Sequence, residues 1–309
     1  MKKIAMSILL GLSVLAVPIS YYSFGPALEP FQWEVLRTLL YIMGFVTIYC
    51  FVVGELTLNN SQVDKLWSIL PIVYVWIVAY YGDFAPRLIL MALLVTFWGV
   101  RLTTNFALKG AYQWRFWTGE EDYRWQVLRS KDEFKPRWKW MLFNLLFISL
   151  YQNFLILLFT LPTLIALHFV ATPLGWIDVV AAVLVFGFIV FEMIADIQHW
   201  RFQSKKWSLI RSGQELPESY KKGFLDKGLW SLSRHPNYFA EQAIWASFYI
   251  FSVAAGAPIF NWTIAGVILL IVLFQGSSAF GEEISASKYP TYQEYQKQVS
   301  KFIPYFRKK

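Results

Sequence analysis

The sequence predicts an all-α protein that crosses a membrane several times. Hydrophobic residues make up 57% of the 309 residues and charged residues only 16%, whereas a soluble domain is about a quarter charged. The mean hydropathy is +0.43, and several nearly uncharged runs are about twenty residues long. Such runs suit spanning helices better than one large soluble core. The composition also excludes disordered, collagen-like and disulfide-stapled proteins.

Eight apolar segments have the length of a spanning helix. The first follows two lysines, so it is either an uncleaved helix, which we expect, or a secretory signal peptide. The fifth is too long for one upright span, and Pro162 within it permits a kink, so we expect one long bent helix. The segments are residues 4–21, 35–54, 67–82, 87–108, 140–170, 175–199, 238–256 and 259–280.

The basic residues indicate the orientation. If the chain starts inside, 25 of its 28 Lys and Arg lie in cytoplasmic segments, which the positive-inside rule requires. Both termini are therefore expected in the cytoplasm. We divide the chain into residues 1–34, a signal-anchor-like helix with its outer loop, and residues 35–309, a transmembrane domain with basic cytoplasmic loops and a C-terminal tail. We expect a monomer surrounded by membrane lipids.

Metal and nucleic acid are not expected as ligands. The three histidines do not form a spaced metal set, and the single cysteine, Cys50, lies inside an apolar run. The net charge is +8. Part of the positive charge lies in a loop in which aromatic residues alternate with arginines, among them Arg124 and Arg129. That loop can lie on anionic lipid or fold over a phosphorylated ligand. It would face the membrane, and no nucleic-acid-binding module surrounds it.

Two polar stripes run along predicted spans. Glu192, Asp196, His199 and Gln203 are spaced 4, 3 and 4 residues apart, so they share one helix face. The stripe is either a hydrogen-bonded seam between helices or, as two carboxylates favour, a site for a polar ligand. The other stripe places an aromatic ring, two cations and an amide on one face and suits an anion, although Lys109 alone can be explained by snorkelling. It consists of Trp98, Arg101, Asn105 and Lys109.

Asp64 is a third polar position, just before the third apolar segment. It can cap the helix that follows it. Alternatively, with Gln62 or an aromatic residue as its partner, it points into the bundle and polarises a substrate. A carboxyl group can do so when burial keeps it protonated.

The densest pattern precedes the seventh segment, where the chain reads Gly228 to Glu241. Pro236 fits a first helical turn, which places the preceding Arg234 and His235 beside a helix N-terminus. An arginine at a helix N-terminus favours phosphate or carboxylate, and Glu241, one turn inside, suits a hydroxyl or amide donor. The pattern can also be interfacial capping alone.

Taken together, these residues resemble the membrane steroid 5-alpha-reductase-like family, specifically its bacterial branch, formerly domain of unknown function 1295. The resemblance covers residues 55–306 and places the protein in a bacterial cytoplasmic membrane. Prenylcysteine methyltransferases share the Arg-His-Pro-Asn-Tyr run. The matching pieces are Val63–Ser68, Trp98–Leu102, Glu121–Trp125, Leu128–Arg129, Gly228–Trp230, Ser233–Glu241, Tyr292–Gln296 and Phe302–Pro304.

The resemblance implies a seven-helix core, here with one extra N-terminal helix. It also implies NADPH in a cavity facing the cytoplasm and a lipid substrate that enters from the bilayer. Asp196, Asn237 and Glu241 match cofactor positions of the family, and Tyr220 is a further match. Our full set of expected cofactor contacts is Arg101, Asn105, Lys109, Arg124, Arg129, Glu192, Asp196, His199, Tyr220, Arg234, His235, Asn237, Tyr238, Glu241 and Tyr295.

In animal members of that family, a glutamate in a Gln-Glu-Leu-Pro motif and a tyrosine one turn before an arginine polarise the substrate ketone. The corresponding stretches here read Gln62–Asp64 and Trp98–Arg101. Trp98 stands at the position of that tyrosine, and its indole cannot donate a proton as a phenol does. The tyrosine's role is therefore vacant or has moved, for example to Tyr74. Asp64 and Gln62 are therefore our expected catalytic residues.

The sequence thus predicts an NADPH-dependent reductase of carbonyl-conjugated C=C bonds in a hydrophobic substrate that is steroid-like, isoprenoid or another lipid. One alternative is an S-adenosylmethionine-dependent methyltransferase acting on a lipid or prenylcysteine. Another is a lipid-binding or assembly protein in which the polar stripes only hold helices together.

Overall fold

The structure is a computed structural model that describes residues 17–305. This part of the chain is helical, as predicted, and contains no strand beyond an isolated bridge between Ser233 and Ser300. Five of its helices are long and apolar enough to cross a membrane, which confirms a membrane protein. They are α2 (Pro30–Thr57), α5 (Pro86–Leu108), the continuous helix Arg137–His168, α10 (Trp176–Arg211) and α13 (Ile264–Lys288).

Three predicted spans differ from this set. Segment 67–82 forms only the 12-residue helix α4 (Leu70–Tyr81), about 18 Å long, which is shorter than the bilayer core. Segment 238–256 forms α12 (Pro236–Ala255). Its first turns are polar, so it is less apolar than the five candidate spanning helices. Segment 4–21 lies mostly outside the described residues.

The fifth segment is one long helix, as predicted, and it begins at Arg137. Two irregularities divide it. Residues Asn144–Tyr151 (η2) form a π-helix, which the sequence did not indicate, and a break at Leu161 precedes the turn that starts with Pro162. Proline removes a backbone donor, so a break there is expected. The regular parts are α7 (Arg137–Phe143), α8 (Gln152–Thr160) and α9 (Pro162–His168).

Short helices occupy the loops at both ends of the long ones. Several helices begin where proline fits the first turn, including Pro86 in α5 and Pro236 in α12. The remaining elements are α3 (Gln62–Leu66), α6 (Tyr123–Arg129), η1 (Asp132–Phe134), α11 (Glu218–Lys221), η3 (Gly228–Ser231) and α14 (Tyr292–Gln298).

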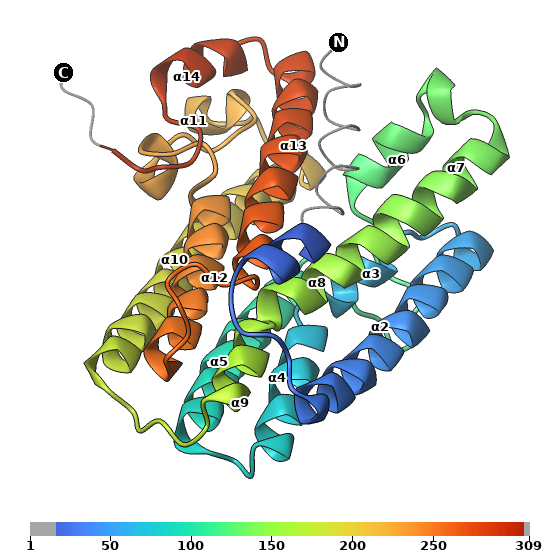
Figure 1. Cartoon of the computed structure of the whole chain (residues 1–309). Helices are drawn as coiled ribbons and strands as arrows, with labels where there is room; N and C mark the ends of the chain where they lie inside the picture. The colour runs from blue at the N-terminus through green and yellow to red at the C-terminus, as the bar shows by residue number, and fades with distance from the viewer. Residues whose placement is uncertain (1–16, 306–309) are drawn as a thin grey trace. The chain divides into compact units, whose positions relative to one another are not determined.

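The chain forms two compact units, and α10, α12 and α13 each contribute to both. The first unit comprises the described residues up to Val183 together with Ala246–Leu270. Within it, α4 packs against α2, α5, α8 and α9 (Figure 1). The contact of α5 with α4 is close, because a Cβ atom at Gly99 would lie 2.6 Å from Cδ1 of Ile72. These helices form the apolar core of the first unit.

The second unit comprises Leu184–Trp245 and the described residues from Ile271 onward. It contains the later part of α10, the start of α12, the later part of α13, and the elements α11, η3 and α14. Aromatic rings fill much of its interior. Phe224 contacts both Tyr292 and Tyr295, with ring centroids 5.0 and 5.2 Å apart. These contacts attach the C-terminal helix α14 to the loop before η3.

Candidate functional site

The expected site residues fall into two groups, one in each unit. The first group surrounds the short helix α3, which follows α2. Asp64 is the third residue of α3 rather than the residue that caps a later helix, so the capping alternative is wrong. Its Oδ2 accepts a hydrogen bond of 2.9 Å from Nε1 of Trp125 in α6. An aromatic residue is therefore one partner of this carboxyl group, and Ser61, which precedes α3, is another.

Burial raises the pKa of Asp64 above its usual value. The negative charge of Asp122 adds to the shift, while the hydrogen bond from Trp125 opposes it. For Asp122, burial acts in the same direction, but Arg124 outweighs it and lowers the pKa. Of these two neighbouring carboxyl groups, Asp64 is the one that retains its proton to higher pH, and in that form it can donate a hydrogen bond.

The loop cations that we expected at a phosphate are engaged with acids of the same loop. Arg124 Nη2 lies 2.7 Å from Asp122 Oδ2, and Arg129 Nη2 lies 2.5 Å from Glu121 Oε1. Glu121 Oε1 also accepts a hydrogen bond from the backbone N–H of Asn60. These pairs fold the loop over α3 and hold Trp125 against Asp64.

Two further residues tie α3 to the same loop. Gln62 is fully buried, and its Nε2 donates to the carbonyl oxygens of Asn59 and Trp117. Lys65 is also fully buried, and its Nζ donates to the carbonyl oxygens of Phe116 and Thr118. Burial lowers the pKa of Lys65. Gln62 therefore acts here as a positioning residue, and Lys65, which the sequence analysis missed, acts with it.

The stripe along α5 passes from the core to the surface. Trp98 and Arg101 are buried, Asn105 is half-buried and Lys109 is exposed. On the neighbouring α4, Tyr74 is fully buried, and its hydroxyl has no hydrogen-bond partner within residues 17–305. An isolated buried hydroxyl is costly unless water or a ligand satisfies it.

The second group lies where α10 and α12 meet in the second unit. Glu192, Asp196 and Glu241 are all buried. Asn237 Nδ2 donates to Asp196 Oδ1 at 3.3 Å, which links the two helices. One turn further along α12, Trp245 Nε1 donates to Glu241 Oε1 at 3.1 Å. Three buried carboxyl groups thus occupy one polar region of this unit.

Asn237 has an open acceptor. Its Oδ1 is buried and accepts no hydrogen bond from any residue between 17 and 305. A buried amide oxygen of this kind fits a ligand that donates a hydrogen bond, such as a carboxamide or a ribose hydroxyl. This open acceptor lies one turn before Glu241, the residue for which the sequence predicted a hydroxyl or amide donor as partner.

The loop before α12 packs closely on α10. The rings of His199 and Trp230 lie 5.0 Å apart, and Trp230 Nε1 donates to the carbonyl oxygen of Ala195. Gly228 has a φ of +63°, and a Cβ there would lie 2.6 Å from Oε1 of Gln198. The Gly-Leu-Trp motif therefore has a packing role. Tyr220 of α11 also packs on α10, because its ring stacks on the ring of Phe202.

Arg234 and His235 both contact a residue that the sequence analysis did not single out, Glu282 of α13. Arg234 Nε lies 2.6 Å and His235 Nε2 3.0 Å from Glu282 Oε1. Burial lowers the pKa of His235, although Glu282 partly offsets it. Tyr238 stacks on His235, and the hydroxyl of Tyr295 donates to the carbonyl oxygen of Trp230. These contacts join the C-terminal segment to the start of α12.

Comparisons with known proteins identify the family of this chain. A family model described as a protein of unknown function (DUF1295) matches residues 50–299. The chain belongs to the DUF1295 family. An uncharacterised protein of the fission yeast Schizosaccharomyces pombe is 38% identical over 260 residues, which is 80% of this chain and 73% of the yeast protein. No solved structure matches.

The DUF1295 region contains all the candidate residues of both groups, from Gln62 to Tyr295. The contacts that sequence reasoning missed within it include Lys65 with Phe116, Trp125 with Asp64, and His235 with Glu282, and each joins residues 47 or more positions apart. For Lys65 the sequence offered one weak signal, its position directly after Asp64. Glu282 carried no signal, because it lies near the polar end of a long helix.

Proposed function

We propose that this protein is an NADPH-dependent reductase of the cytoplasmic membrane that saturates a carbonyl-conjugated C=C bond in a hydrophobic substrate. The proposal includes a seven-helix core with one extra N-terminal helix, and both termini in the cytoplasm. The observation that carries it is the buried polar region of the second unit, where Asn237 Oδ1 lacks a donor beside the buried Asp196 and Glu241. Bound NADPH would supply the hydride.

The residues present fit such a cofactor. Asn237 Oδ1 would accept from the carboxamide or a ribose hydroxyl, and the carboxyl groups of Asp196 and Glu241 would accept from further hydroxyls. Arg234 and His235 are held by Glu282, so their role is to position the start of α12.

Asp64 would hold the substrate oxygen. Its raised pKa favours the protonated carboxyl group, and the hydrogen bond from Trp125 fixes the orientation of that group. A proton donor aimed at a carbonyl stabilises the negative charge that develops when hydride reaches the conjugated carbon. Tyr74 is the phenol available to share this role, because its hydroxyl is buried and open.

The proposal is tested by thermal unfolding of the detergent-purified protein with NADPH, NADH or S-adenosylmethionine. A ligand that binds only the folded state raises the midpoint. Stabilisation by NADPH alone is the expected result. Stabilisation by S-adenosylmethionine alone would replace the reductase with a methyltransferase, and no stabilisation by any of the three would favour a lipid-binding or assembly protein.

Replacing Glu241 by Gln is expected to weaken NADPH binding about tenfold, since a carboxylate partner of a hydroxyl is lost. Gln keeps an oxygen that can accept the hydrogen bond from Trp245, so the unfolding midpoint without ligand should stay within a few degrees. Isothermal titration calorimetry gives the affinity. The control is Glu218→Gln, which removes an exposed carboxylate of the same unit. Equal affinities in the two variants would remove Glu241 from the site.

A further inference from the structure

A pocket of about 530 Å³ opens in the first unit, at the helix ends opposite α3. It lies where α2 and α5 begin and where α4 and α9 end. Since α2 has 28 residues, its first residue, at the pocket, lies about 42 Å from its last residue, which leads into α3 and Asp64. The pocket contains none of the candidate residues described above, and its volume is in the range of small-molecule sites.

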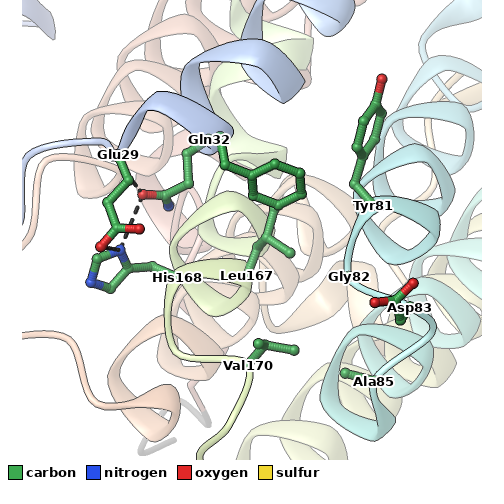
Figure 2. Close-up of a pocket in the computed structure, with 10 residues that line it drawn as sticks. Glu29, Gln32, Tyr81, Gly82, Asp83, Ala85, Leu167, His168 and Val170 are labelled. Carbon is green, nitrogen blue, oxygen red and sulfur yellow. Dashed lines mark hydrogen bonds and ion pairs between the residues drawn. The ribbon is translucent and has the colours of Figure 1, made fainter.

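Acidic and aromatic side chains line this pocket. Glu29 and Asp83 flank it on opposite sides (Figure 2). The rings of Phe31 and Tyr81 form an edge-to-face pair with centroids 6.0 Å apart. The lining, all within the described residues, includes no Lys or Arg. Two helix N-termini and two C-termini meet here, so their dipoles largely cancel, and the negative charge at the pocket comes from the carboxylates of Glu29 and Asp83.

One wall of the pocket is firmly held. Gln32 is 2% exposed, its Nε2 donates to the carbonyl oxygen of Leu164, and its Oε1 accepts from the backbone N–H of Glu29. Because Oε1 is an acceptor, His168 Nδ1, which lies 3.1 Å away, carries the proton in this contact. Glu29 Oε1 lies 3.7 Å from the same ring nitrogen. This network fixes the Glu29 side of the pocket before any ligand arrives.

We propose that this pocket binds an organic cation of the choline type. Carboxylates on two sides attract a positive charge, and aromatic rings favour a quaternary ammonium group through cation–π contact. A phosphate ester of the same cation would bring its negative charge against Glu29 or Asp83, so the free cation is the preferred ligand over a phospholipid headgroup. This site is independent of the reductase proposed above.

The test uses calorimetry on full-length protein purified in a maltoside detergent, without NADPH. The probes are choline, its uncharged isostere 3,3-dimethylbutan-1-ol, and phosphocholine. Saturable binding of choline is expected, with the other two probes bound at least about tenfold more weakly. Equal binding of the alcohol would show an apolar pocket, equal binding of phosphocholine would show a lipid headgroup site, and no binding of choline would show an empty crevice. Each of these three outcomes overturns the proposal.

Variants locate the binding. Glu29→Gln and Asp83→Asn should each weaken choline binding roughly three- to tenfold, because each removes one charge from a partly exposed site. Asp83 has a φ of +49°, and Asn tolerates that conformation, so the turn should be kept. Glu34→Gln, which removes an exposed carboxylate of α2 outside the pocket, should bind choline as the unmodified protein does. An unchanged affinity in both pocket variants would contradict the assignment.

Discussion

If the proposed reductase activity is present, replacing Asp64 by Asn is expected to lower its turnover by about a hundredfold or more, on the order of what a positioned proton donor contributes. Asn keeps an oxygen that can accept from Trp125, so the fold around α3 should survive. The measurement is NADPH oxidation with an enone lipid in detergent micelles, with the unfolding midpoint recorded in parallel. Asp132→Asn is the control, because its carboxylate is 90% exposed and forms a surface ion pair with Lys135.

The pH dependence follows from the direction of the Asp64 shift. Since burial raises the pKa of this carboxyl group, the folded protein binds its proton more tightly than the unfolded chain does. Both the proton-donating form and the associated stability are therefore present at low pH, and both are lost as pH rises through the folded-state pKa. Asp64→Asn should lack both changes. Turnover that is unchanged in this variant would exclude Asp64 as the donor.

Replacing Asp178 by Asn is expected to destabilise the first unit by about 3–5 kcal/mol, the usual cost of leaving a buried charge without its partner. Asp178 and Arg87 are 1% and 4% exposed, and Arg87 Nε donates to Asp178 Oδ1 at 2.8 Å. Arg87 Nη2 donates to Asp178 Oδ2 at 2.9 Å. The pair joins the first turns of α5 and α10.

Tryptophan fluorescence during denaturation in mixed micelles measures this loss. The double variant Arg87→Met with Asp178→Leu tests the cause, because removing both charges avoids an unpaired buried ion and should cost less than Asp178→Asn alone. A single variant that unfolds within about 1 kcal/mol of the unmodified protein would show that the guanidinium is sufficiently held by its bonds to the carbonyl oxygens of Thr172 and Pro173.

The sequence alone determined the helical class and the approximate positions of the long helices. Long apolar runs require helices in a bilayer, because a helix satisfies its own backbone hydrogen bonds. Proline set several first turns, as at Pro86 and Pro236, through its fixed φ angle and missing donor. The spacing of Glu192 and Asp196 also placed them correctly on one buried face of α10.

Only the tertiary structure decided which polar groups meet. Asp64 and Trp125 are 61 residues apart, Arg87 and Asp178 91 apart, and Arg234 and Glu282 48 apart. Helical periodicity relates residues three or four positions apart and carries no information about such partners. For that reason Arg124 and Arg129 read as free loop cations in the sequence, although each is paired with an acid in the folded chain. Burial, which raises the pKa of Asp64, likewise depends on segments that meet only after folding.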